Sequence, residues 1–148
     1  MKSEKGFSLI EVMLAIALLG VVSVAFLGAM STASKAIFIA DEQATAESIA
    51  RSQMEYVKSL AYITAAGSPP SGPQAVYNGA KISVPSGYEI RSINRAGNED
   101  TSANIIGVPW NSQSGLPLGT DGGLQRVKLV IKHIDKQVLT LEGFKVKR

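Results

Sequence analysis

The stretch Lys5-Gly6-Phe7-Ser8-Leu9-Ile10-Glu11-Val12 begins an apolar run that continues to Met30. The rest of the chain follows this run. Between Phe7 and Met30 the only ionisable side chain is Glu11. As a helix, these roughly 24 residues would be about 36 Å long, which exceeds the roughly 30 Å hydrocarbon core of a bilayer. The run therefore predicts a helix that spans a membrane.

Glu11 is the costly residue of this helix. About thirteen residues of the run are Leu, Ile, Val or Phe, and together they favour insertion by about 4 to 8 kcal/mol, whereas one central acidic group opposes it by about 3 kcal/mol. The helix can therefore carry Glu11. Because intramembrane ionisable groups are expensive, we regard Glu11 as a candidate functional residue that needs a positively charged partner.

Glu11 has three interpretations. It has no role, it belongs to a proton or ion path, or it pairs with a cation held at the same depth by another subunit. A single-span chain disfavours the ion path. The pairing becomes concrete if the chain is cut after Gly6, because the new α-amino group of Phe7 would be a cation at the positive end of a helix dipole. A repeated amine-to-carboxylate contact between identical chains would build a filament.

The helical pattern continues beyond the membrane segment and becomes one-sided. Residues 31–66 contain no proline, and apolar residues recur at helical spacing in a stripe made of Ile49/Ala50, Met54, Tyr56/Val57 and Leu60/Ala61. We expect one helix from about Phe7 to about Ala65. Its one-sided half needs a second layer to cover the stripe.

The remainder predicts an antiparallel sheet. Residues 67–73 form a turn-rich linker, and short alternating segments follow at 75–77, 81–84 and 88–93. Residues 94–123 are rich in Gly, Asn, Ser and Asp and read as a long, partly mobile or surface-packed loop with a brief apolar island. In residues 127–142, apolar and polar residues alternate on both sides of a turn at 134–137, which predicts a hairpin. The odd-numbered face of this hairpin should cover the helix stripe. Beyond Gly143 the apolar parity changes, which predicts a β-bulge there.

Composition disfavours several functional classes. The net charge is +3 among 148 residues, cysteine is absent and histidine occurs once, so we expect no cofactor, no metal site and no catalytic site. His133 is more simply a core or edge residue than a ligand. Residues 98–100 and 121–123 could supply oxygen ligands for Ca²⁺, but they lack the usual spacing. We therefore interpret them as ordinary turn residues. The basic C-terminal end (Lys145, Lys147, Arg148) reads as a solvated hairpin, and a nucleic-acid partner is not expected.

Lys5-Gly6 followed by Phe7-Ser8-Leu9-Ile10-Glu11-Val12 resembles the signal of type IV prepilins and type II secretion pseudopilins. The resemblance implies cleavage by a prepilin peptidase between Gly6 and Phe7, N-methylation of Phe7, and contact of Glu11 with the N-terminus of a neighbouring subunit. It also implies an α+β, pilin-like fold, with a long N-terminal helix packed on a small antiparallel β-sheet. The Glu11-Val12-Met13-Leu14-Ala15 start and the short basic C-terminal hairpin favour a minor subunit.

The expected organisation is a cleaved leader (1–6), a transmembrane segment (7–30), an amphipathic continuation (31–66) and a sheet with loops (67–148). The leader lysines and the acidic residues at 41–42 predict a single-pass protein of the cytoplasmic (inner) membrane with its N-terminus inside, later part of an extracytoplasmic filament. Its partners would be the peptidase, other pilin or pseudopilin subunits, the inner-membrane assembly platform and the lipid bilayer.

Two departures from the family stand out: no proline kinks the helix, and no disulfide closes the C-terminal region. Two other interpretations stay open. One is a membrane-anchored extracytoplasmic binding domain that does not polymerise. The other is a secretory signal cut near Ala33.

Overall fold

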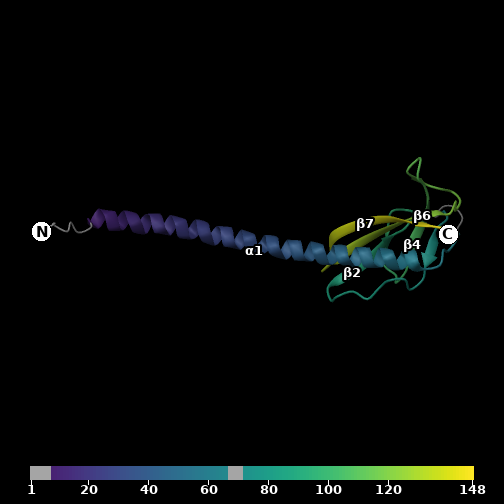
Figure 1. Ribbon diagram of the computed structural model, residues 1–148, viewed down its shortest axis with the longest axis horizontal. Coiled ribbons are helices and arrows are strands. Elements are labelled where there is room, and N and C mark those ends of the chain that lie inside the picture. The colour runs from purple at the N-terminus through teal and green to yellow at the C-terminus, as the bar shows by residue number, and fades with distance from the viewer. Residues whose placement is uncertain (1–7, 67–71) are drawn as a thin grey trace. The chain divides into compact units, whose positions relative to one another are not determined.

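The computed structural model describes residues 8–66 and 72–148 (Figure 1). The chain forms two compact units, one ending at Asp41 and the other comprising Glu42–Arg148. Helix α1, Leu9–Ser59, is 51 residues long and contributes to both.

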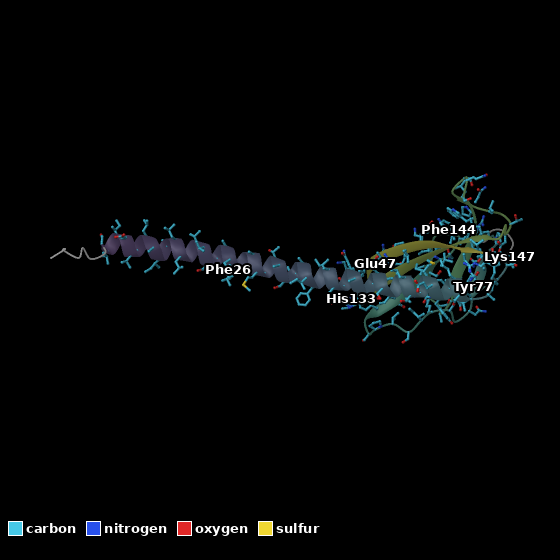
Figure 2. The ribbon with its side chains drawn as sticks, viewed as in Figure 1. Phe26, Glu47, Tyr77, His133, Phe144 and Lys147 are labelled. Atoms are coloured by element: carbon cyan, nitrogen blue, oxygen red, sulfur yellow. The ribbon has the colours of Figure 1, made fainter. Side chains whose placement is uncertain are left out.

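The first unit is the apolar part of α1. Its large side chains point outward on every side, with 79% of Leu9 and 63% of Phe26 exposed (Figure 2). Its hydroxyl groups bond within the helix: Ser23 donates to the carbonyl of Leu19 at 2.8 Å, and Thr32 to that of Gly28 at 3.1 Å. Such internal bonds leave few polar groups that need water. The helix is long and apolar enough to cross a membrane.

The second unit packs the end of α1 on an antiparallel sheet (Figure 1). The strands are β1 Ala75–Tyr77, β2 Tyr88–Ile93, β3 Glu99–Asp100, β4 Ile105–Asn111, β5 Leu116–Pro117, β6 Leu124–His133 and β7 Lys136–Val146. Strand β6 is central: β7 pairs along one edge, whereas β4 and β2 share the other. Strands β1 and β5 pair with β4, and β3 pairs with β2.

The core lies between the helix stripe and the sheet. Val127, Leu129 and Ile131 of β6 are fully buried, as the odd-numbered pattern predicts. On α1 the buried stripe is Ala46, Ile49, Ala50, Met54 and Val57. This confirms the α+β architecture expected from the sequence. Tyr56, which we placed in the stripe, is 41% exposed.

The helix ends earlier than expected, at Ser59 rather than near Ala65. Residues 60–65 are irregular, and Ala66 pairs with Gln74 in an isolated bridge. Ile63 and Thr64 are β-branched and form helices poorly. The backbone groups left free at the helix end find partners in distant parts of the chain, so the shorter helix is not penalised.

The region 94–123 is not simply a loop. Strand β4 runs through it, and Ile105, Ile106 and Val108 are almost completely buried. The apolar island that we noted is thus a strand between β1 and β6. Residues 81–84, in contrast, form no strand. The Gln53 side chain holds this segment instead, donating to the carbonyl of Ala80 at 2.6 Å and accepting from the Ile82 amide at 2.8 Å.

The prediction of a β-bulge at Gly143 is wrong. Pairing continues through Val127↔Gly143 and Arg126↔Phe144, and the register shifts near Val138 instead. Phe144 therefore faces outward, whereas Lys145 is 4% exposed and faces the helix. A Cβ added at Gly143 would lie 2.7 Å from Met54 Sδ, so the glycine permits close packing of helix on strand. The positions of the apolar residues were misleading here, because the inward-facing position 145 holds a lysine and the outward-facing position 144 holds a phenylalanine.

Candidate functional site

Glu11 lies in the first turn of α1, where Ser8 begins the helical hydrogen bonding. The Ser8 carbonyl accepts the amides of Glu11 at 3.0 Å and Val12 at 3.2 Å. A carboxylate in the first turn is favoured by the positive end of the helix dipole. Glu11 is exposed on a surface shared with Ala15 and Leu19.

No cation within the described part of the chain pairs with Glu11. The neighbouring side chains are apolar and mostly exposed, including 72% of Ile10 and 65% of Met13. Glu11 is therefore an isolated carboxylate on an apolar helix. In lipid such a group is costly until a positive group reaches it. The other two predicted site residues, Gly6 and Phe7, lie outside the described residues.

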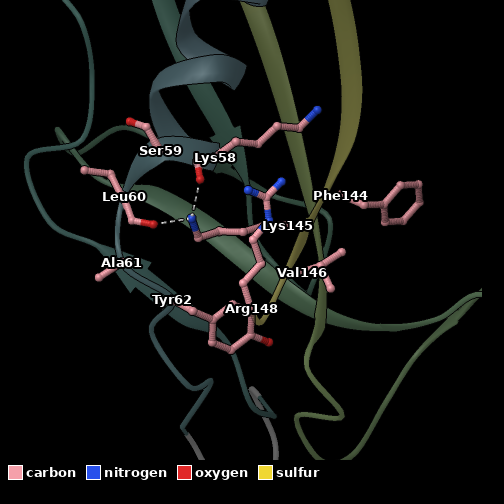
Figure 3. Close-up of a pocket in the computed structure, with 9 residues that line it drawn as sticks. All are labelled: Lys58, Ser59, Leu60, Ala61, Tyr62, Phe144, Lys145, Val146 and Arg148. Atoms are coloured by element: carbon pink, nitrogen blue, oxygen red, sulfur yellow. Dashed lines mark hydrogen bonds between the residues drawn. The ribbon is translucent and has the colours of Figure 1, made fainter.

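In the second unit, Lys145 joins the last strand to the end of the helix. Its Nζ donates to the carbonyls of Val57 at 2.7 Å, Lys58 at 3.2 Å and Leu60 at 2.6 Å. Figure 3 shows the bonds to Lys58 and Leu60. It also lies 5.4 Å from the centre of the Tyr77 ring. Val57 and Lys58 belong to the last turn of α1 and Leu60 follows its end directly, where carbonyls lack helical partners and a cation is favoured. Burial lowers the pKa of Lys145, and the nearby charge of Arg148 lowers it further.

Asp121 is a second residue that connects distant parts of this unit. Its Oδ1 accepts the Tyr62 hydroxyl at 2.5 Å and the Gly123 amide at 2.9 Å, and its Oδ2 accepts the Ala65 amide and the Gln125 side chain at 2.7 Å each. Burial alone would raise the pKa of Asp121, but these hydrogen bonds outweigh it and lower the pKa below its ordinary value. Burial, with the bond to Asp121, raises the pKa of Tyr62. Asp121 thus fixes the segment that follows the helix.

His133 lies at the opposite end of β6. Its Nδ1 is 2.7 Å from Glu42 Oε1, and its ring stacks on Tyr88 with centroids 4.4 Å apart. The side chain is 29% exposed. A histidine held between a carboxylate and an aromatic ring connects the sheet to the helix, which agrees with its interpretation as an edge residue.

The carboxylates considered as Ca²⁺ ligands bind protein groups. Asp121 accepts its four hydrogen bonds from protein donors. Glu99 pairs with Lys132 at 2.7 Å, and Asp100 accepts the Ser102 amide at 2.7 Å. Among the described residues, no group of three His, Asp or Glu side chains is arranged to hold a metal ion.

Sequence reasoning missed Lys145, Asp121 and Gln53. Each is polar and bonds to main-chain groups of segments more than 25 positions away. The sequence offered one signal, the odd-numbered position of Lys145 on the hairpin, but we had interpreted Lys145 as part of a solvated basic end.

Comparisons with known proteins identify one segment. Residues 1–27 match the family model of the prokaryotic N-terminal methylation motif. No curated protein matches the chain. No solved structure matches it either.

The motif and the fold support the same conclusion. The motif at residues 1–27 supports a type IV prepilin- or pseudopilin-like protein, and the long apolar N-terminal helix with an antiparallel sheet is consistent with a pilin-like fold. The motif implies interaction with a prepilin peptidase and with other pilin subunits in general, and it points to a structural subunit rather than an enzyme. An apolar helix that begins within this motif fits a membrane-anchored protein.

Proposed function

We propose that this chain is a structural subunit of a type IV pilus or a type II secretion pseudopilus, assembled through Glu11. The observation that carries the proposal is the isolated Glu11 carboxylate on an exposed apolar helix, within the segment that matches the methylation motif. Cleavage between Gly6 and Phe7 would create the cation that this carboxylate lacks. Methylation of the Phe7 amine would leave its positive charge in place.

We propose that the pairing is intermolecular. After cleavage, the Phe7 amine of every subunit would be a cation at the positive end of its own helix dipole, where a cation is disfavoured. The Glu11 carboxylate of a neighbouring chain displaced along the helix axis would neutralise it. In low dielectric the attraction is several times stronger than in water. One contact of this kind for each subunit defines the register of a filament.

We also propose the membrane placement and a minor role. The leader lysines, Lys2 and Lys5, favour a cytoplasmic N-terminus, so the folded unit would lie outside the inner membrane. The minor role rests on the Glu11–Ala15 start and the short basic hairpin. A minor subunit would prime, cap or modify a filament used for adhesion, motility, DNA uptake or secretion.

The experiment follows processing and assembly separately. Mass spectrometry of the mature protein should find a methylated Phe7 and no leader. Glu11→Gln should be inserted and processed normally but should be recovered in sheared filaments at about one-tenth of the wild-type level, since the charge pair is lost. Ser23→Ala, a polar change farther along the same helix, should assemble normally.

Two outcomes would overturn the proposal. An intact Met1 in the mature protein, or a cut near Ala33, would exclude prepilin processing. Equal recovery of Glu11→Gln and wild type in filaments would exclude the charge pair. A processed chain that never enters filaments would instead be a membrane-anchored binding domain.

A further inference from the structure

The second unit contains a cavity of about 530 Å³ between the end of α1 and the last strand. It is lined by residues 58–62 from the helix end, by residues 144–146 of β7 and by Arg148. Cavities that bind small ligands or single side chains have volumes of about 300–1,000 Å³. The cavity lies at the opposite end of the helical segment from Glu42, where the chain enters this unit. The cavity is formed by residues of the second unit alone.

The charged side chains that line the cavity are all positive. They are Lys58, Lys145 and Arg148, and no Asp or Glu lines it (Figure 3). In the view of Figure 3 the Arg148 guanidinium lies between the Lys58 and Lys145 side chains. Because like charges repel, such a group costs free energy unless an anion joins it.

These three residues differ from four basic residues of the unit that form ion pairs. Arg51, Arg91, Arg126 and Lys132 each pair with a glutamate at 2.5–3.8 Å. Within residues 8–66 and 72–148, no ion pair involves Lys58, Lys145 or Arg148. Ion pairs are likewise absent, within that described part, at Lys81, Arg95, Lys128, Lys136 and Lys147, so this group is distinguished by the gathering of its three positive side chains around one cavity.

Lys145 supplies a fixed charge at the base of the cavity. Its three hydrogen bonds to main-chain carbonyls use all three protons of the ammonium group, which holds it in place without neutralising it. The helix end offsets only about half of one charge. Lys58 and Arg148 are exposed at the rim and retain free donors. An arginine there can bind a carboxylate through two parallel hydrogen bonds.

We propose that this cavity, which we call the helix-end site, binds a carboxylate from a short acidic peptide segment of a partner protein. Arg148 binds the carboxylate, Lys58 binds a second oxygen or the next acidic residue, and the buried Lys145 adds its field from below. Leu60 and Val146 provide apolar contact for the stem of the acidic side chain.

The geometry favours a peptide over a nucleic acid. Nucleic acids are bound along basic grooves with aromatic side chains on which bases stack. Here the positive charge is concentrated at one point. Of the two aromatic residues that line the cavity, Phe144 points away from Lys145 and Arg148 (Figure 3), and Tyr62 is held by its hydroxyl on Asp121. A site of this size suits one or two carboxylates. The proposal is independent of filament assembly, since it uses only the second unit.

The test uses the full chain in uncharged detergent micelles at low salt. The probe is a hexaglutamate peptide with a neutral dye, and binding is measured by fluorescence anisotropy. Wild type should bind the probe saturably and should ignore the hexaglutamine peptide with the same dye. Arg148→Gln and Lys58→Gln should each weaken binding about five- to tenfold. Both residues are exposed, so the fold should tolerate the changes.

Lys136→Gln is the matched control, because Lys136 is an exposed lysine at the opposite end of β7. It removes the same charge and should change the affinity less than twofold. Equal weakening by all three variants would mean attraction by net charge alone and would overturn the site. So would absence of saturable binding to wild type. Tighter binding of a single-stranded oligodeoxynucleotide of equal charge would overturn the peptide assignment.

Discussion

The two parts of α1 differ in what stabilises them. From Leu9 to Asp41 the helix has no buried residue, although nearly all of its large side chains are apolar. From Glu42 to Ser59 the composition is more polar, yet Ala46, Ala50 and Val57 are fully buried. Within the described residues, the more apolar part thus has no packing partner, whereas the buried stripe of the less apolar part is covered by the sheet.

This difference shows that burial here follows the pattern of apolar residues rather than their number. A helix that is apolar all round matches lipid or other apolar helices, whereas a helix with one apolar stripe matches a sheet. Substitutions in the second part should therefore change the stability of the folded unit, and those in the first should not. The single tryptophan, Trp110, lies in β4 and reports unfolding of that unit alone.

The largest effect is expected from a matched pair of leucines. Leu129→Ala, at a fully buried position on β6, should lower the free energy of unfolding by about 3 kcal/mol through lost burial and a cavity. Leu18→Ala, at a position 60% exposed on the apolar helix, should leave it unchanged. Urea titrations of the full chain in micelles, followed by Trp110 fluorescence, measure both. Similar losses for the two variants would contradict the division of the helix.

Lys145→Met should have the next largest effect, because it leaves the carbonyls at the end of α1 without their shared donor. We expect a loss of about 2 kcal/mol in the free energy of unfolding, although the apolar stem is preserved. Lys147→Met, two positions along and exposed, is the control and should be neutral. If the two variants unfold at the same urea concentration, Lys145 does not cap the helix.

Asp121→Asn should cost about 1–2 kcal/mol at neutral pH, since an amide cannot accept all four hydrogen bonds. The effect depends on pH. Because the folded-state pKa of Asp121 is below its ordinary value, its contribution is present above about pH 4 and is lost as the pH falls through the folded-state pKa. The difference between wild type and variant should thus shrink in acid. A constant difference from pH 7 to pH 2 would rule out this role.

The smallest effect is expected at the contact between Glu42 and His133. Both side chains are about one-quarter exposed, so solvent weakens the interaction. We expect a coupling free energy of about 0.5–1 kcal/mol from a double-mutant cycle of Glu42→Gln and His133→Gln. The cycle uses the same urea titrations. A coupling of zero would mean that stacking on Tyr88, rather than the carboxylate, holds the histidine.

The sequence predicted those parts of the fold that depend on periodicity. The buried stripe of α1, the segments that became β1 and β2, and the odd-numbered face of β6 all follow from local spacing. Glu11 could be identified because a charge in an apolar run is conspicuous without any structure.

The errors arose where tertiary contacts outweigh local preference. The helix end depends on Lys145 and Asp121, which lie more than 50 positions later in the chain. Strand β4 was hidden because glycine and proline interrupt it, and burial on both faces removes its alternation. The supposed bulge at Gly143 came from assuming that an inward residue must be apolar.

The position of β6 also constrains how the molecule is made. This strand is central to the sheet, yet it is synthesised after all the others except β7. Until residues 124–133 have left the ribosome, the buried stripe of α1 has no sheet to cover it, and only local pairings such as β1 with β4 can form. The newly made chain thus exposes an apolar helical face for most of its synthesis, a period in which aggregation competes with folding.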